Sequence, residues 1–359
     1  MSATSSPAAA SAAGTGAPWV AVPRLTTRLQ ASELGVVINQ NDPLSVALGE
    51  YYIRRRGIAA EQVLRVEVPL KPALSFAEFE ALREKIQTTL GSRVQALALV
   101  WSQPYAVECN SITAALAIGF QGALCQQSCA PSRPSPMFNS ASSRPHADLG
   151  VLPAMLLAAR SLEAGKALIE RGIAADGSAV AAERRPGSVL PQAYFLSSDD
   201  KARNVRAALF PRAGVLAGMQ IRQQPVSAEP LPNALLLSSG QMRVEGLDKI
   251  GWLPGALADH LTSFGGRLDA PPQSAQMSAI EWLDAGATAS YGTVSEPCNH
   301  LQKFPHPQVL LLHYLQGATA LEAYWRSVAW PGQGVFIGEP LAAPFAAVPP
   351  RAASAVSRQ

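Results

Sequence analysis

The stretch LGVVINQNDP, residues 34–43, joins a short apolar run to the residues that end a strand and open a helix. The β-branched residues within Leu34 to Asn39 are typical of a buried strand, and Pro43 is well placed at the start of a helix. That helix should reach the arginines at 54–56, which complement its carboxyl end, and stop at Gly57. A strand followed at once by a helix indicates an α/β unit.

The same alternation continues towards the C-terminus. Residues 63–68 form a second predicted strand, and Ser75 to Glu78 has the spacing of a capping box, which starts a helix running to Leu90. The run QALALVW at 95–101 predicts a third buried strand. This order of strands and helices favours parallel pairing through right-handed crossovers.

The α/β pattern resumes after residue 150, with a linker-like stretch at 177–191. The remaining predicted helices cover 152–171, 201–209, 278–284, 309–315 and 320–327, and the remaining strands 193–196, 234–237, 256–262, 287–293 and 335–337. We therefore predict one large α/β domain over residues 31–346, with a mostly parallel sheet flanked by helices. Residues 102–150 should form an insertion that carries three cysteines, and residues 1–30 and 347–359 disordered tails.

Composition excludes several classes of protein. Charged residues make up 15% of the 359 residues, and the net charge is +3. The sequence contains no run of Lys and Arg residues interspersed with aromatic residues. Nucleic-acid binding is therefore not expected. No run approaches the roughly 18 apolar residues of a membrane span. The N-terminus lacks the basic and apolar regions of a secretory signal, which fits either a cytoplasmic protein or a start placed too far downstream.

The four cysteines, Cys109, Cys125, Cys129 and Cys298, allow three interpretations. They are candidates for two disulfides in an oxidising compartment, with three connectivities open. A four-thiolate zinc site usually shows two Cys-x-x-Cys pairs, and this spacing does not match that pattern. Alternatively, Cys298 is a catalytic thiol activated by His300, two residues away.

Ligands of open parallel sheets bind outside the carboxyl ends of the strands, so the polar residues there are candidates for a peptide or small-molecule site. These residues are Asn39, Asn41, Asp42, Trp101, Ser239, Glu296 and Asn299. Asp259, His260 and Ser263 lie close in sequence, but strand alternation keeps them off one shared face. Neither a glycine-rich nucleotide loop nor a histidine pair with zinc spacing occurs, so no cofactor and no metal are expected.

Motifs near the C-terminus resemble gingipain-type, caspase-like cysteine peptidases. They are WLDAGATASYGT at 282–293, YLQGAT at 314–319 and IGEP at 337–340. From residue 33 to 345 the chain also resembles a family of uncharacterised bacterial proteins. The segments that carry this second likeness are 36–58, 135–140 (SPMFNS), 200–211, 257–266 and 286–299. Members of that family commonly carry a signal peptide, so the resemblance implies a periplasmic or secreted protein.

The gingipain resemblance implies a parallel sheet with a histidine after one strand and a nucleophilic cysteine after the next. Carried onto this chain, those positions fall on Ser239 and Ser263, so neither member of the dyad is present. The first hypothesis is therefore a caspase-like domain without peptidase activity that binds a ligand in the cell envelope. The alternatives are a hydrolase with Cys298 or Ser263 as nucleophile and His260 or His300 as base, and a disulfide-bonded structural protein of the envelope.

Overall fold

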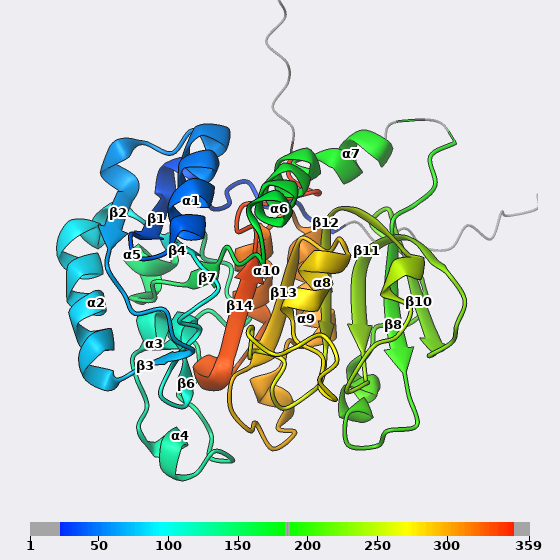
Figure 1. Cartoon of the computed structure of the whole chain (residues 1–359). Coiled ribbons are helices and arrows are strands. Elements are labelled where there is room, and N and C mark those ends of the chain that lie inside the picture. The colour runs from blue at the N-terminus through cyan, green and yellow to red at the C-terminus, as the bar shows by residue number, and fades with distance from the viewer. Residues whose placement is uncertain (1–21, 184, 186, 348–359) are drawn as a thin grey trace, which may run out of the picture.

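The computed structural model describes residues 22–183, 185 and 187–347, and its centre is one eleven-stranded sheet. The strand order is β2-β1-β4-β7-β14-β13-β12-β11-β8-β10-β9 (Figure 1). Every neighbouring pair is parallel except β13 with β14 and β10 with β9. The predicted class, α/β with a mostly parallel sheet flanked by helices, is confirmed.

The antiparallel β13–β14 pair divides the sheet into two halves that run in opposite directions. We call β2, β1, β4, β7 and β14 the N-half, and β13, β12, β11, β8, β10 and β9 the C-half. The carboxyl ends of the N-half strands lie at one edge of the sheet, the N-edge. The carboxyl ends of β8, β11, β12 and β13 lie at the opposite edge, the C-edge.

The N-half follows the sequence closely. Its strands are β1 (Leu34–Asn39), β2 (Val63–Val66), β4 (Ala96–Val100), β7 (Ala154–Leu156) and β14 (Gly334–Gly338), and its helices α1 (Pro43–Arg56), α2 (Phe76–Thr89) and α6 (Leu162–Ala175). The Asp42 side chain caps α1, and Gly57 ends that helix in the left-handed conformation. The predicted capping box of Ser75 and Glu78 is present at α2.

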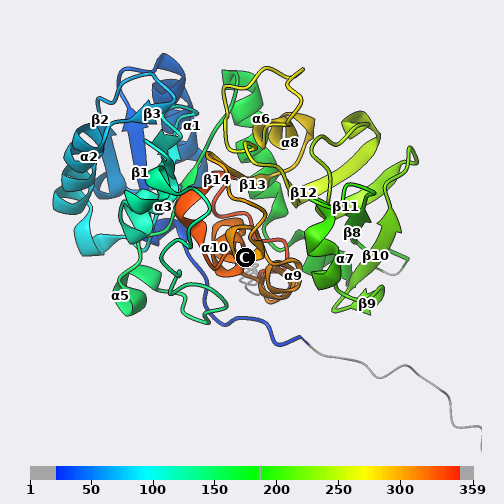
Figure 2. The ribbon, with the colours of Figure 1, turned by 90° about the horizontal axis from the view of Figure 1, so that it is seen from below.

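The C-half contains longer strands. They are β8 (Gln192–Ser197), β9 (Gly214–Leu216), β10 (Met219–Pro225), β11 (Leu231–Ser239), β12 (Ile250–His260) and β13 (Ala289–Thr293). Its helices are α7 (Ser178–Glu183), α8 (Ile280–Ala285), α9 (Pro307–Leu315) and α10 (Ala320–Ser327). Helices α6 and α8 lie on one face of the sheet, and α9 and α10 on the other (Figure 2).

The insertion folds into short elements beside β14. They are β5 (Ala106–Val107), β6 (Asn110–Ser111), α3 (Ile112–Ile118), α4 (Ala123–Gln126) and α5 (Pro145–Leu149). In a second sheet, β5 pairs with both β3 (Ala73–Leu74) and β6. The Ser111 hydroxyl donates to the Gly334 carbonyl, 2.6 Å away, at the start of β14. The insertion is thus anchored at the C-edge.

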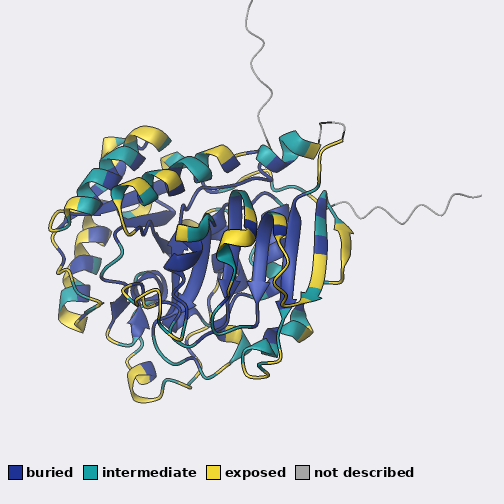
Figure 3. Ribbon diagram, turned by 45° about the vertical axis from the view of Figure 1, so that its right-hand side comes forward, coloured by how far each residue is buried: buried dark blue, intermediate teal, exposed yellow. Residues whose placement is uncertain are grey.

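The core is the sheet itself, which is buried between the two helical layers (Figure 3). Central strands such as β4 and β14 are buried along their whole length, as expected of parallel strands covered on both faces. The packed chain begins earlier than residue 31, because Leu29 is buried and the Leu25 amide donates to Gln316. The predicted tails at 1–21 and 348–359 lie outside the described residues.

Several predicted elements differ from the structure. The predicted helix 152–171 is instead β7 followed by α6, because Ala154 to Leu156 fill a fully buried slot between β4 and β14 that overrides their helical propensity. Residues 201–209 contain a 3₁₀ helix from Asn204 to Leu209, and the predicted linker 177–191 contains α7. Strands β9 and β10 were not predicted. None of the described helices is long and apolar enough to cross a membrane.

Candidate functional site

The predicted ligand-binding residues fall at two opposite edges, which corrects the expectation that they form one site. Ser239, Glu296 and Asn299 belong to the C-edge, whereas Asn39 and Trp101 follow the ends of β1 and β4 at the N-edge. The physical reason is the antiparallel β13–β14 pair, which reverses the strand direction in mid-sheet. A sequence pattern that treats the sheet as uniformly parallel cannot detect this reversal.

The polar residues at the N-edge are used within the fold. Asn39 is fully buried, and its side chain donates to the Val68 carbonyl and accepts from the Val68 amide, both at 3.1 Å. Asn41 bonds the same carbonyl at 3.3 Å, and Asp42 caps α1. The Trp101 indole donates to Pro104 at 3.0 Å. These contacts give the four N-edge candidates a structural role.

The C-edge is built around a buried ion pair. Arg206 and Asp259 approach to 2.6 Å with side chains only 2% exposed. Arg206 also donates to the Pro305 carbonyl at 3.2 Å and the Ser239 carbonyl at 3.4 Å. One guanidinium therefore ties the end of β11, the end of β12 and the segment before α9 together. Sequence reasoning missed this residue, although an arginine within an apolar helical run is a detectable signal.

His260 has no nitrogen available for proton transfer in this structure. Its Nε2 bonds the Met277 carbonyl at 3.0 Å, and its Nδ1 accepts from the Trp282 indole at 3.0 Å. Burial lowers the pKa of His260 to about 3, so the ring is neutral at ordinary pH. This geometry argues against a role as general base and fits a hydrogen-bonded core histidine.

The two serines at the dyad positions have no imidazole partner among the described residues. The Ser239 hydroxyl donates to the Gln241 side chain at 3.1 Å and is almost fully buried. Ser263 is half-buried, and its carbonyl accepts from Thr293 at 2.8 Å. Gln276 holds the loop that follows β12, because it accepts from the Thr262 hydroxyl and the Phe264 amide.

The other four histidines contact groups other than the candidate nucleophiles. His146 bonds a backbone carbonyl, His306 caps α9 and His313 bonds Asn139. His300 packs edge-on against Trp330, with ring centres 5.9 Å apart. Within the described part of the chain, no hydrogen bond joins a histidine ring to a serine or cysteine side chain.

All four cysteines are paired, Cys109 with Cys125 and Cys129 with Cys298. The disulfide prediction is thereby supported and its connectivity resolved, whereas Cys298 offers no thiolate in this state. The second bond joins the insertion to the loop after β13, where Glu296 accepts from the Cys298 amide at 2.8 Å. Asn299 is exposed beside it, and both Cys298 and Asn299 have positive φ angles.

Lys303 lies buried beneath this covalent link. Its ammonium donates to the Ser128 carbonyl at 2.6 Å, and burial lowers the pKa of Lys303 to about 8. The neighbouring residue of Ser128 is Cys129, so the disulfide and the lysine hold the same turn of the insertion. The sequence carries no signal for this contact, because 175 residues separate its two partners.

A cavity of about 390 Å³ opens on the α8 side of the C-half, within the usual size range of ligand sites. Its wall contains the end of β8 and the loops before β11 and β12. The lining residues are Leu196, Val226, Ser227, Ala228, Glu229, Leu231, Gln241, Val244, Glu245, Gly246, Lys249 and Ile250. Gln241 links this cavity to Ser239 at the C-edge. No three metal-ligating side chains cluster anywhere in residues 22–183 and 187–347.

Comparison with known proteins gives architectural neighbours only. No protein-family model matches the sequence, and no curated protein matches it. Among solved structures, the Arg-specific cysteine proteinase gingipain R is similar at 12% identity over 88% of this chain and 80% of its own, with a TM-score of 0.45. A structure described as a protease is similar at 10% identity over 88% of this chain and 78% of its own, with a TM-score of 0.46. The complex of the pro- and mature domains of Porphyromonas gingivalis RgpB is similar at 11% identity over 87% of this chain and 79% of its own, with a TM-score of 0.41.

Proposed function

We propose that this protein binds a peptide at the C-edge without cleaving it. One observation carries the proposal: the described residues pair no histidine with a hydroxyl or thiol, and all four cysteines are in disulfides. A serine needs an adjacent base, and a cysteine a free thiolate, to act as a nucleophile. The described residues therefore bring no base to a hydroxyl or thiol as acyl transfer requires, while the cavity that Gln241 links to Ser239 is open.

The C-half cavity supplies the chemistry for peptide recognition. Leu196, Val226 and Val244 provide apolar walls, while Gln241 and Lys249 add polar groups. Two loops form its sides, and loop backbones present amide and carbonyl groups that pair with an extended chain. We expect a peptide with one large apolar side chain to place that side chain in the cavity.

The disulfides support a role in an oxidising compartment, the periplasm or the cell exterior. They cross-link the insertion at two points, including a link between residues 169 positions apart. Membership of the bacterial family that shares the motifs at 36–58 and 286–299 remains part of this proposal. Titration of free thiols in unreduced, unfolded protein purified from its native host tests the compartment, and four reactive thiols would contradict it.

A library of fluorescein-labelled tetrapeptides, screened by fluorescence polarisation, tests the binding role. We expect binding by peptides with a large apolar residue, and mass spectrometry should recover those peptides intact. Ala228 is exposed and lines the cavity, so Ala228→Trp should abolish binding, whereas Ala141→Trp at an exposed site elsewhere should not. Peptide cleavage that Ser263→Ala abolishes would contradict the proposal and favour the hydrolase alternative.

A further inference from the structure

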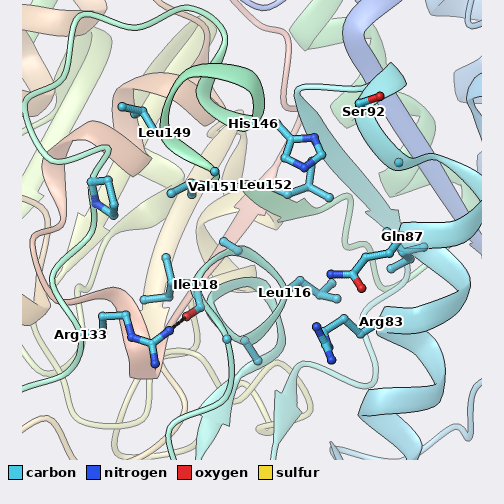
Figure 4. A pocket seen from close by; sticks show the side chains of 17 residues that line it. Arg83, Gln87, Ser92, Leu116, Ile118, Arg133, His146, Leu149, Val151 and Leu152 are labelled. Carbon is cyan, nitrogen blue, oxygen red and sulfur yellow. Dashed lines mark hydrogen bonds between the residues drawn. The ribbon is translucent and has the colours of Figure 1, made fainter.

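A second cavity, of about 550 Å³, lies between α2, α3 and the segment from residue 133 to residue 152. It is separate from the C-half cavity, because it lies among elements of the N-half and the insertion (Figure 4). Its volume falls within the range of sites that enclose a small organic ligand. None of the predicted site residues lines it.

The floor of this cavity is aliphatic. Ile86 comes from α2, Leu116 and Ile118 come from α3, and Leu149 and Val151 come from α5 and the segment after it. Leu116 is the half-exposed residue of an otherwise buried helix, so its side chain lies at the surface of the cavity. Such a floor favours the apolar body of a ligand over a bare inorganic ion.

The rim carries two arginines, of which Arg133 has no ion-pair partner among the described residues and Arg83 pairs with Glu80. His146 also lines the cavity, and the lining contains no aspartate or glutamate. In Figure 4 the arginines stand on opposite sides of the cavity, with His146 between them at a third side. Gln87 adds a further polar group near Arg83, and Ser92 adds one on the side of the cavity that carries His146. This arrangement favours an anionic group.

Internal contacts use only part of this donor capacity. Arg133 donates one side-chain bond, from Nη1 to the Ile118 carbonyl, and forms no ion pair with any described residue. Arg83 donates hydrogen bonds from Nε and Nη2 to the Glu80 carboxylate, and its Nη1 takes no part in that ion pair. The guanidinium of Arg133 retains most of its five donors for an oxygen anion.

Gly119 creates space beside the Arg133 guanidinium. It ends α3 with a φ of +86°, and a side chain added there would lie 3.3 Å from Arg133 Nη1. Glycine therefore serves both the turn and the approach of a ligand oxygen to the arginine. The head of a bound anion fits next to Gly119, with its apolar body over Leu116 and Val151.

We propose that this cavity binds an organic anion with an apolar body, an alkyl carboxylate or alkyl phosphate, whose charged head pairs with Arg133. The site is independent of peptide binding at the C-edge. Arg133 supplies charge-assisted hydrogen bonds, Arg83 adds longer-range attraction, and the aliphatic floor covers the chain.

Displacement of the fluorescent anion 1-anilinonaphthalene-8-sulfonate from the folded, disulfide-intact protein tests this site. Decanoate and decyl phosphate should displace the dye at least tenfold more effectively than decanol, which has the same chain without charge. Inorganic phosphate, the head group alone, should also be at least tenfold weaker. The stronger of decanoate and decyl phosphate identifies the preferred head group.

Variants assign the binding to this cavity. Arg133→Gln should weaken decanoate binding about tenfold, the loss of one charge-assisted contact. Its control is Arg212→Gln, at an exposed arginine that forms no ion pair among the described residues. Leu116→Trp should fill the cavity and abolish binding. Ala228→Trp, which fills the other cavity, should leave it unchanged.

Four results would overturn the proposal. The first is equal displacement by decanol and decanoate, which would make the site a plain apolar patch. The second is displacement by phosphate as strong as by decyl phosphate, which would leave a simple ion site. The third is the absence of decanoate binding to the wild-type protein. Decanoate binding that is unchanged in Arg133→Gln and Leu116→Trp variants, with thermal unfolding that matches wild type, would count equally against it.

Discussion

The N-edge and the C-edge of the same sheet are held together by different means. At the N-edge, Arg56 and the fully buried Glu339 form a fork, with Arg56 Nε at 2.9 Å from Oε1 and Nη2 at 2.7 Å from Oε2. Tyr52 adds a third bond to this carboxylate at 2.8 Å, and Asp176 accepts from Arg56 Nη1 at 2.6 Å. The N-edge is therefore closed by a satisfied, non-covalent network.

The C-edge pair is less completely satisfied and is supplemented by covalent links. Arg206 reaches Asp259 through Nη1 alone, and its buried Nε has no partner among the described residues. Close by, the Cys129–Cys298 bond holds the insertion against the loop after β13. The comparison teaches that both edges join distant parts of the chain, but the C-edge adds a disulfide to an incompletely satisfied ion pair, whereas the N-edge relies on a fully paired carboxylate alone.

The largest expected effect is at the disulfides. Replacing Cys129 and Cys298 together by serine opens a loop of 169 residues, and replacing Cys109 and Cys125 opens one of 16. The chain-entropy relation then gives losses of about 5 and about 3 kcal/mol in the free energy of unfolding. Urea denaturation of the two double variants measures both values.

Amide hydrogen exchange shows which part of the protein is destabilised when the Cys129–Cys298 disulfide is removed. In the Cys129→Ser/Cys298→Ser variant, amides of the C-edge should lose more protection than those around Glu339 at the N-edge. Equal acceleration at both edges would show that the two edges do not behave as separate units.

The next largest effect concerns the two buried ion pairs. Glu339→Ala removes an acceptor of three hydrogen bonds and should cost about 4 kcal/mol, whereas Asp259→Ala should cost about 3 kcal/mol because Arg206 keeps two carbonyl partners. Glu170→Ala is the control, because its carboxylate pairs with Arg55 and accepts from the Tyr51 hydroxyl near the surface, so its loss should destabilise the protein less than either buried change. A larger loss of unfolding free energy in Asp259→Ala than in Glu339→Ala would show that the C-edge ion pair contributes more to stability than the N-edge network.

The smallest expected effect, taken per pH unit, is a pH dependence in the C-half. The unfolded chain binds a proton at His260 below about pH 6.5, whereas burial holds the folded pKa at about 3. Stability should therefore fall as the pH drops from 6.5 towards 3, by about 1.4 kcal/mol per pH unit from this residue. Urea denaturation between pH 7 and 4 should show a shallower slope for His260→Gln, and an identical slope would refute this assignment.

Local elements were predictable because their signals lie within a few residues. Pro43 and Gly57 bound α1 as expected, and Ser75 with Glu78 starts α2. The buried run at 34–39 forms β1 over the same residues. By contrast, Ala154 to Leu156 have no β-branched side chain, and only their place between β4 and β14 makes them a strand.

The sequence by itself determined the α/β class, the capped helices and the presence of four cysteines suited to two disulfides, because periodicity, caps and composition act at short range. Only the tertiary structure decided which cysteines pair, that β14 runs against β13, and that Asn39 and Ser239 lie at opposite edges. It also decided that Arg83 and Arg133 share one cavity. These features join residues far apart in the chain, and the packing of the whole sheet selects them.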